Sequence, residues 1–528
     1  MLPHDHTYKE MYRKFRWKLP EHYNMGWDVC DKWAELEPER AAIIDLTGDK
    51  RRDYSFLDLQ THANQLANHL VSKGIKPGDR VGVFRTQSIW TAAAHIAIWK
   101  MGAISIPLFT LFGKEALETR LENSGARAII TDETHAEKFS ETFEQLPDME
   151  HVIVPENDKI AEHPQAFVQA HTTPETPGLI IYTSGTTGPP KGALHAHRVL
   201  LGHLPGVELF HDLLPQKGDV FWTPADWAWI GGLMNVLMPA LHHGIPVVAS
   251  KLTKFTGEAC QKIINDGGVR NVFFPPTALR MLKAEGKTLK GLRSVGCGGE
   301  PLGEEMLNWG KEALNLTINE FYGQTECNLV IATCNRLFEP KPGCMGKPVP
   351  GHDVAVIDDK GMPTLEEGDI AVKRGSASMM LEYWQNPKAT RDKFRHDWLL
   401  TGDRGIMEGE YIRFVGRDDD VITSAGYRIG PAEIEDCLLK HEAVASVGVI
   451  GKPDPERTEI VKAYVLLRED VTGDAALCDA LKKFVKANLS AHEYPREIDF
   501  VNALPMTVTG KIIRKELKAR AAKELEKE

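Results

Sequence analysis

A loop rich in hydroxyl groups and glycine occupies residues 182–192, where the sequence reads YTSGTTGPPKG. It follows the apolar run 179–182, which predicts a short buried strand. Glycine lets backbone N–H groups turn toward a ligand, hydroxyl groups can follow phosphate oxygens, and Lys191 adds a compact positive charge. Two prolines precede this lysine and a glycine follows it, so the loop is not a Walker A sequence. We expect a phosphate-binding loop, the alternative being a flexible polar turn.

In each of two further segments, a predicted strand ends at residues that suit a ligand site. Residues 294–301, SVGCGGEP, run into glycines, and residues 320–326, EFYGQTE, place a carboxylate beside a hydroxyl and an amide. Ligands of α/β sheets bind at such strand ends. Mg²⁺ prefers oxygen ligands shared with phosphate, so we predict that Glu326 holds Mg²⁺. A solvated surface charge is the alternative for this residue.

Three tryptophans lie beside a glycine pair in residues 221–232, FWTPADWAWIGG. Aromatic side chains next to glycine can wall an apolar pocket, and we expect this of Trp229, whereas Trp222 suits the core. His195 and His197 follow the loop closely, but no nucleophile or metal-ligand spacing accompanies them. We therefore expect polar or packing roles for both histidines.

The segments between these motifs predict the scaffold. Ser55 to Asp58 reads as a capping box that opens a helix, and strand-like runs alternate with helical runs through residue 330. Such alternation predicts a largely parallel sheet covered by helices. From 341 to 415 the strands are short and separated by turns, which predicts a small antiparallel sheet or barrel. The polar run 416–420 is the expected domain boundary.

Composition excludes several classes of function. The net charge is -11, so nucleic acid is not an expected partner. No segment is long and apolar enough to span a membrane, and residues 1–20 lack an apolar h-region, so we do not expect a secretory signal. The eight cysteines contain no Cys-x-x-Cys pair, which fits a reducing cytoplasm without a zinc site. The oligomeric state, including a homo-oligomer, stays open.

Four motifs together resemble those of the acyl-adenylate-forming superfamily, which includes acyl-CoA synthetases, adenylation domains of peptide synthetases and luciferases. They are residues 182–192, 322–326, 401–403 and 416–435, the last accompanied by Gly510 and Lys511. The resemblance extends from the region of Trp27 to the last helix. Residues 424–431, SAGYRIGP, look most like the short- to medium-chain acyl-CoA synthetases.

The resemblance implies an α/β fold: a large N-terminal domain of α/β layers with a small β-barrel-like part, then a small mobile α+β C-terminal domain. We place the domains at 1–416 and 421–528, with a hinge at 417–420 in which Asp419 matches the family's hinge residue. It also implies two half-reactions. A carboxylic acid attacks the α-phosphate of ATP to give acyl-AMP and pyrophosphate, and CoA then takes the acyl group and releases AMP.

The resemblance also implies an ATP site, whose expected members are Thr183, Ser184, Gly185, Thr186, Thr187, Gly188, Lys191, Gly299, Glu300, Pro301, Tyr322, Gly323, Gln324, Thr325, Asp403 and Arg417. The loop would hold the β- and γ-phosphates, residues 299–301 would flank the adenine, and Tyr322 would stack on it. Asp403 and Arg417 would bind the ribose hydroxyl groups.

Three residues are the candidate catalytic groups by the same resemblance. Thr325 would touch the α-phosphate, Glu326 would hold Mg²⁺, and Lys511 would reach both the substrate carboxylate and the α-phosphate. This chemistry depends on positioning and charge stabilisation, which agrees with a sequence that offers loops and lysines but no nucleophilic triad. ATP and CoA are the expected co-substrates.

The acyl and CoA sites follow from the resemblance as well. The acetate-specific members carry tryptophan where this chain has Gly323, so we expect a pocket that admits longer acids and is bounded by Trp229 and Gly231. Branched or aromatic acids stay open. The expected CoA contacts are Ala425, Gly426, Tyr427, Arg428, Arg457, Lys486 and Tyr494, with solvated charge as the alternative for Arg457 and Lys486.

Two other functions compete with a cytoplasmic acyl-CoA synthetase for short- to medium-chain fatty acids. The first is a ligase that loads a carrier-protein thiol; the sequence after Lys511 offers no carrier domain, which favours free CoA. The second is a non-catalytic nucleotide sensor, which has no need of Lys511, Glu326 and Asp403 together. The acid itself, and whether Lys511 is acetylated, are left open by the sequence.

Overall fold

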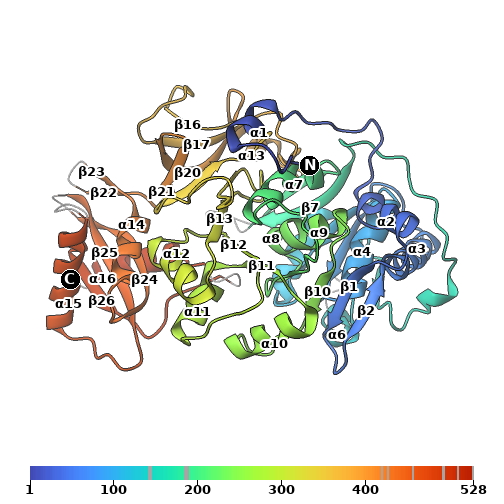
Figure 1. Ribbon diagram of the computed structural model, residues 1–528, viewed down its shortest axis with the longest axis horizontal. Coiled ribbons are helices and arrows are strands. Elements are labelled where there is room, and N and C mark those ends of the chain that lie inside the picture. The colour runs from blue at the N-terminus through green and yellow to red at the C-terminus, as the bar shows by residue number, and fades with distance from the viewer. Residues whose placement is uncertain are drawn as a thin grey trace.

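The computed structural model describes residues 1–140, 146–183, 190–417, 420–424, 427–454, 457–489, 494–507 and 511–525. Helices and strands alternate through the N-terminal domain, and a small domain of sheet and helices ends the chain, at the left of Figure 1. This arrangement confirms the predicted α/β class. The capping box predicted at Ser55 begins α3 (Phe56–Ser72), where the Ser55 hydroxyl accepts from the Asp58 N–H and the Asp58 carboxylate accepts from the Ser55 N–H.

The largest sheet carries both strand ends singled out in the sequence. Its order is β16-β17-β20-β21-β15-β14-β13-β12-β11-β9-β10-β1-β2, with β19 beside β20. The run from β1 through β10, β9, β11 and β12 to β13 is parallel, so the carboxyl ends of β12 and β13 meet at one edge. The bounds are β1 Ala41–Leu46, β2 Arg52–Ser55, β9 Phe221–Trp222, β10 Val247–Ser250, β11 Asn271–Phe274, β12 Ser294–Gly298, β13 Ile318–Tyr322 and β14 Ile331–Ala332.

Helices cover both faces of this parallel region, and the alternation of side chains along β11 shows why. Phe274 packs with Leu279 and Leu282 on one face, whereas its neighbour Phe273 packs with Leu204 and Leu233 on the other. The helices of the first face are α10 (Gly257–Gly267), α11 (Pro276–Ala284), α12 (Glu304–Trp309) and the π-helical turn η5 (Gly310–Leu314). Those of the second face are α7 (Val199–Phe210), α8 (Ile230–Gly232), the π-helical turn η4 (Leu233–Leu237) and α9 (Met238–His242).

A second sheet, of order β18-β8-β7-β4-β3-β5-β6, carries the hydroxyl-rich loop between β7 and β8. Helix α4 (Ile89–Lys100) is buried along its whole length because it contacts the cores of both sheets, through Ile96 on one side and Ile98 on the other. The remaining bounds are β3 Arg80–Phe84, β4 Ile104–Pro107, β5 Ala128–Thr131, β6 His151–Ile153, β7 Pro177–Thr183, β8 Lys191–Ala196, β18 Glu382–Tyr383, α1 Tyr8–Lys14, η1 Trp27–Asp31, α2 Lys32–Leu36, α5 Lys114–Ser124, α6 Glu133–Ser140 and η3 Ile160–Glu162.

The short strands expected after residue 341 are antiparallel, as predicted, but they do not form a separate sheet. They extend the largest sheet, because β15 pairs with β14 on one side and with β21 on the other. The bounds are β15 Cys344–Pro348, β16 Val354–Ile357, β17 Gly368–Lys373, α13 Pro387–Asp392, β19 Phe394–Arg395, β20 Trp398–Glu408 and β21 Tyr411–Arg417. This continuity brings β20 and β21 to the same region as β13.

The C-terminal domain is a sheet with helices on both faces. Its strands run β23-β22-β25-β24, with β26 parallel to β25. Ile434 and Leu481 pack on one face of the sheet, and Leu517 packs on Tyr464 on the other. The bounds are β22 Ile422–Ser424, β23 Tyr427–Ile429, α14 Pro431–Leu439, β24 Val444–Asp454, β25 Thr458–Leu467, α15 Ala475–Asn488, β26 Glu497–Phe500 and α16 Arg514–Leu525.

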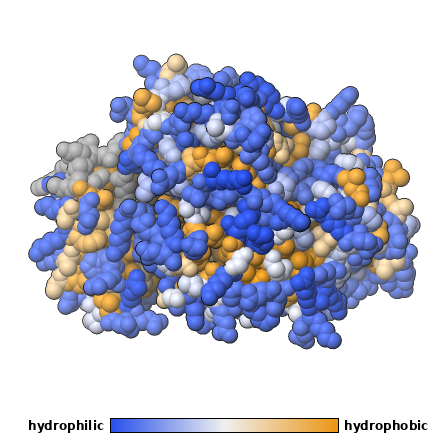
Figure 2. Space-filling view, in the orientation of Figure 1, coloured by the Kyte–Doolittle hydropathy of each residue, from blue (hydrophilic) through white to orange (hydrophobic). Residues whose placement is uncertain are grey.

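The face of the molecule shown in Figure 2 is covered mainly by hydrophilic side chains, and the hydrophobic ones appear in small groups. Among the described residues, no helix combines the length and the apolar character that crossing a bilayer requires.

Candidate active site

The hairpin that carries the hydroxyl-rich loop is formed by β7 and β8, where Thr183 pairs with Lys191. The Thr183 hydroxyl donates to the Lys191 carbonyl at 3.4 Å. Ser184, Gly185, Thr186, Thr187 and Gly188 of the predicted ATP site lie outside the described residues. Thr183 and Lys191 therefore define the two ends of the loop.

Tyr383 connects this hairpin to the predicted magnesium ligand. The Lys191 ammonium group lies 5.5 Å from the centre of the Tyr383 ring, whose hydroxyl donates to Oε1 of Glu326. The Glu326 carbonyl also accepts from the Met380 N–H at 2.8 Å, so backbone and side chain are both held. Glu326 is buried, and Thr325 beside it is half-buried. The sequence offered no signal for Tyr383, because it is distant in the chain from both partners.

The donor groups around Glu326 indicate whether this place could hold a magnesium ion. The described residues contain no group of three or more His, Cys, Asp or Glu side chains arranged around a metal position. A single fixed carboxylate suits an ion that takes its other ligands from substrate phosphates and water. The donor set at Glu326 is therefore compatible with Mg²⁺ that arrives with ATP.

The predicted ribose-binding aspartate is held by side chains of the β13 strand end. The Tyr322 hydroxyl donates to Oδ2 of Asp403 at 2.5 Å, and the Gln324 amide donates to the same oxygen at 3.2 Å. Asp403 on β20 pairs with Arg417 on β21, so the two predicted ribose contacts lie on neighbouring strands. Burial raises the pKa of Asp403, whereas Tyr322, Arg417, Lys393 and Lys511 oppose that shift.

Lys393 is a basic residue of this site that sequence reasoning missed. Its ammonium group donates to the side-chain oxygen of Gln324 at 3.1 Å and to the Thr401 carbonyl at 3.3 Å. Its charge also acts on Asp403. The residue follows α13 and belongs to no motif, so only the fold indicates its place beside the predicted nucleotide-binding strand ends.

Lys511 of the C-terminal domain lies at the junction of the predicted adenine and acyl sites. A Cβ atom added to Gly299 would lie 3.3 Å from Cη2 of Trp229 and 4.0 Å from Cε of Lys511. Gly299 has φ +105°, a backbone conformation that glycine adopts readily. Beside it, Glu300 accepts from Arg280 at 3.1 Å, and Pro301 is exposed. Lys511, Trp229 and Gly299 therefore converge although they come from three distant segments.

The loop that carries Lys511 is closed by its own hydrogen bonds. The Lys511 N–H donates to the Thr507 hydroxyl at 3.0 Å, and the Thr507 N–H donates to the Lys511 carbonyl at 2.7 Å. The Lys511 side chain is exposed to solvent. The surrounding protein nevertheless desolvates its ammonium group and lowers its pKa, whereas the negative charges of Glu300 and Asp403 act to raise that pKa. The domains also touch elsewhere, where Lys440 pairs with Glu304 at 2.7 Å.

The predicted acyl pocket is bounded by packed aromatic rings. Trp229 is half-buried and lies 5.5 Å from Phe273, centre to centre, while a Cβ at Gly231 would be 3.0 Å from both rings. Phe273 lies 5.2 Å from Phe321, which continues this wall along β13. Trp229 and Gly231 therefore pack together, and their part in an acyl pocket stays a prediction.

The structure gives Gly323 a steric reason that the sequence did not indicate. A Cβ at this position would lie 2.2 Å from the backbone N of Leu329 and 2.8 Å from Oδ1 of Asn328. The glycine therefore admits a neighbouring backbone segment, and the interpretation that it opens the pocket to longer acids stays a prediction. Asn328 and Leu329 occupy the space that a larger side chain would need.

His195 and His197 are both fully buried on or next to β8. Burial lowers the pKa of each to about 3, so both are neutral at physiological pH. Nδ1 of His197 accepts from the Met25 N–H at 3.1 Å. These observations agree with the packing roles expected from the sequence.

The candidate CoA contacts fall into two groups on the C-terminal domain. Arg457 precedes Thr458, which pairs with Ser424, and Ser424 pairs with Tyr427, so Arg457 lies near the predicted 425–428 stretch. Ala425, Gly426 and the predicted hinge residue Asp419 lie outside the described residues. For Tyr427 and Arg428 the structure describes the backbone but not the side chains.

The second group gathers around an aromatic ring. The Lys486 ammonium lies 5.4 Å from the centre of the Tyr494 ring, and Arg496, which the sequence did not single out, donates to the Tyr494 hydroxyl at 3.2 Å. These residues present two positive charges at one place, as binding an anionic co-substrate would require.

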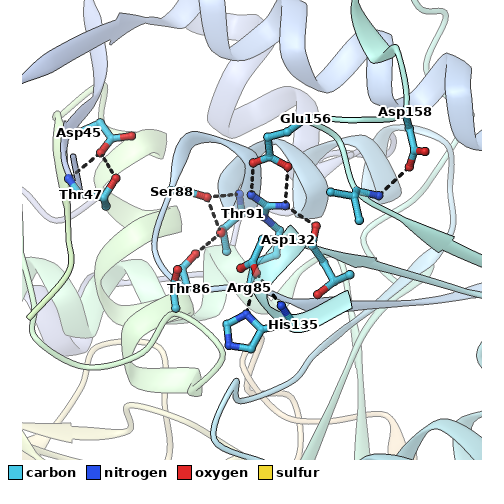
Figure 3. Close-up of polar contacts among 12 residues, drawn as sticks. Asp45, Thr47, Arg85, Thr86, Ser88, Thr91, Asp132, His135, Glu156 and Asp158 are labelled. Atoms are coloured by element: carbon cyan, nitrogen blue, oxygen red, sulfur yellow. Dashed lines mark hydrogen bonds and ion pairs between the residues drawn. The ribbon is translucent and has the colours of Figure 1, made fainter. Parts of the chain in front are cut away.

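A separate polar cluster closes the carboxyl ends of β3 and β5 (Figure 3). Arg85 is buried there, and its guanidinium contacts the Thr131 carbonyl and both carboxylate oxygens of Glu156. Gln87, two residues on, donates to the Thr223 carbonyl at 3.0 Å. The Arg85 contacts tie the ends of one sheet together, and Gln87 links this region to the segment after β9 of the other sheet, so we assign these residues a structural role.

Comparison with known proteins agrees with this geometry. The AMP-binding enzyme family matches residues 30–384, and the AMP-binding enzyme C-terminal domain matches residues 433–511. The chain is 34% identical to the acetyl-coenzyme A synthetase of Bacillus subtilis, over 97% of this chain and 95% of that protein. It is 31% identical to the mitochondrial acyl-coenzyme A synthetase ACSM3 of Mus musculus, over 97% of this chain and 93% of that protein.

A solved structure gives the same architecture. The crystal structure of the anthranilate CoA ligase AuaEII in complex with anthranoyl-AMP superposes with a TM-score of 0.88 at 27% identity, covering 96% of this chain and 99% of that chain. The similarity therefore extends over both domains of the chain.

Proposed function

The chain belongs to the AMP-binding enzyme family, within the acyl-adenylate-forming superfamily, and is an AMP-forming acid–CoA ligase. We propose that it activates a short- to medium-chain carboxylic acid with ATP and transfers the acyl group from acyl-AMP to CoA. The observation that carries this proposal is the convergence of Lys511, Trp229 and Gly299. It supports an arrangement in which one lysine meets both the acyl end and the nucleotide end of the site.

In the first half-reaction, the chain's own residues position the two reactants and offset charge. Lys191 at the end of the loop attracts the departing pyrophosphate, while Asp403, held by Tyr322, orients the ribose. The Lys511 ammonium stabilises the negative charge that develops as the carboxylate attacks the α-phosphate. A magnesium ion held by Glu326 would add charge neutralisation at the phosphates when it is bound.

In the second half-reaction, Lys511 has to leave so that the CoA thiol can reach the acyl carbon. We propose that the C-terminal domain, 421–528, turns about the hinge 417–420 relative to 1–416. Two features support this: the hinge falls between the two matched regions, 30–384 and 433–511, and the pair Lys440–Glu304 across the domains is partly exposed and hence weak. The second basic group, Lys486 and Arg496 around Tyr494, would then receive CoA.

Two observations support the proposed chain-length range. The rings of Trp229, Phe273 and Phe321 pack against one another beside the predicted acyl site, and relatives are named acetyl- and acyl-coenzyme A synthetases. We propose the cytoplasm as its location, supported by eight cysteines without a Cys-x-x-Cys pair; the mouse relative is named mitochondrial. A carrier-protein ligase and a nucleotide sensor remain the alternatives that the experiment has to separate.

The test is pyrophosphate release from ATP with a panel of acids from acetate to decanoate, with and without CoA. The proposal expects release that depends on the acid, with AMP and acyl-CoA formed only when CoA is present. Release without any acyl-CoA, but with a loaded carrier protein, would identify the carrier ligase. No acid-dependent release from folded, ATP-binding protein would identify a sensor and contradict the proposal.

A further inference from the structure

Two buried asparagines lie next to the acyl pocket and have no part in the reaction described so far. Asn235 is 1% exposed and lies in the π-helical turn η4, four residues after Gly231. Asn328 is 4% exposed and follows Glu326 by two residues. The Asn328 amide donates to Oδ1 of Asn235 at 3.1 Å, so the two side chains form one unit.

Close packing places this unit at the acyl end of the site. Oδ1 of Asn328 would lie 2.8 Å from a Cβ at Gly323, and the next residue, Leu329, has φ +62°. The Leu329 side chain fills the space beside Gly206 of α7, where an added Cβ would lie 1.6 Å from its Cδ2. The asparagine pair therefore lies between the strand end that carries Gly323 and the helical turn that continues from Gly231.

The amide of Asn235 is incompletely paired. Its Oδ1 accepts from Asn328, but its Nδ2 is buried and has no hydrogen-bond partner among the described residues. Native proteins leave few buried donors unpaired, because the loss of hydration is not compensated. A leucine at this position would fill similar space without that cost. The unpaired donor therefore indicates that an acceptor from outside the chain completes the site.

The orientation of the donor follows from the pair. Because Asn328 donates its amide hydrogen to Oδ1 of Asn235, the Nδ2 group of Asn235 faces away from that contact. Its neighbours in the turn, Leu233, Met234, Val236 and Leu237, are buried and apolar. π-Helical turns occur often at functional sites, and this one carries Asn235.

We propose that the acid carries an oxygen acceptor on its chain, as an oxo or hydroxy acid does, and that Nδ2 of Asn235 donates a hydrogen bond to it. Asn328 is a positioning residue that holds the Asn235 amide in this orientation. The inference rests on the proposed function, since it names the class of acid that the acyl-CoA synthetase reaction takes. A site with a buried donor discriminates against an acid that lacks the acceptor, because the donor is then left unpaired.

Matched acids test the inference. Pentanoate is compared with 4-oxopentanoate, and hexanoate with 5-oxohexanoate, in wild type and in Asn235→Leu, by kcat/KM for AMP formation with CoA. We expect wild type to prefer the oxo acid of at least one pair by about tenfold or more. We expect Asn235→Leu to bring that ratio to about one or below. Asn328→Ala is expected to lower the ratio in part and to raise KM for the oxo acid more than it lowers kcat.

Asn265→Leu is the matched control, because it makes the same change at an exposed position on α10. The ratio of kcat/KM for the oxo acid to kcat/KM for its matched acid should be the same in this variant as in wild type. The inference is overturned if wild type turns over both members of each pair alike, or if Asn235→Leu lowers both acids by the same factor. The wild-type comparison decides the matter even if a variant does not fold. Failure of every acid to support AMP formation would instead contradict the proposed function.

Discussion

The Tyr322 hydroxyl donates to Asp403 at 2.5 Å and so ties the end of β13 to β20. Gln324 donates to the same carboxylate oxygen at 3.2 Å, and Lys393 in turn donates to the Gln324 side chain at 3.1 Å. This chain of hydrogen bonds fixes the aspartate before any nucleotide arrives. A pre-oriented carboxylate loses less conformational entropy when it binds ribose hydroxyl groups.

Removing this hydroxyl should weaken ATP binding. Tyr322→Phe keeps the ring but deletes a hydrogen bond to a buried charged group, so we expect KM for ATP to rise about tenfold with a smaller change in kcat. The measurement is steady-state kinetics at saturating acid and CoA. Tyr411→Phe is the control, because that hydroxyl donates to the Glu339 carbonyl on the exposed side of β21. Equal KM values for the two variants would contradict the role given to Tyr322.

Filling the position of Gly323 should disturb the whole site rather than retune chain length. Since a Cβ would lie 2.2 Å from the Leu329 backbone N, Gly323→Ala is expected to lower the melting temperature and to reduce kcat/KM about tenfold on every acid. Gly48→Ala serves as control, because nothing lies within 4 Å of its Cβ position. A variant that keeps its melting temperature and turns toward acetate would contradict this expectation and support the interpretation that Gly323 opens the pocket.

The buried carboxyl of Glu320 should make stability fall as pH rises. Burial raises its pKa from 4.5 to about 8, helped by the charge of Asp436 in the other domain. Between these values the folded chain holds a proton that the unfolded chain has released, so the free energy of unfolding decreases with increasing pH. We expect Glu320→Gln to flatten this part of the profile, measured as the urea midpoint from pH 5 to pH 9. A midpoint that falls equally in both proteins would assign the effect to other groups.

The parts of the fold that local chemistry determines were predictable from sequence. The capping box at Ser55 and the strand ends at Gly298 and Tyr322 lie where their local pattern indicates, because side chain and backbone partners are a few residues apart. The antiparallel strands after residue 341 were expected too. Their attachment to the main sheet through β15 was not, since pairing between distant strands leaves no local signal.

The residues of the candidate site also divide into those that the sequence could identify and those that only the fold reveals. The motif residues Glu326, Asp403 and Lys511 were identifiable by type and order, whereas Lys393 and Tyr383 were not, because their partners lie far away in the chain. Gly323 shows a third case. The sequence singled it out for the acyl pocket, which stays a prediction, whereas the approach of the Leu329 backbone is a second reason for glycine that only the fold can reveal.

The most direct test of the account separates the two half-reactions in Lys511→Ala. Loss of the Lys511 side chain, whose Cε lies 4.0 Å from the Cβ position of Gly299, should lower acyl-AMP formation from ATP by about a hundredfold or more. Transfer from supplied acyl-AMP to CoA should stay within a few-fold of wild type, as should both steps in the control Lys515→Ala on the exposed side of α16. Formation of acyl-AMP at the normal rate by Lys511→Ala would contradict the account.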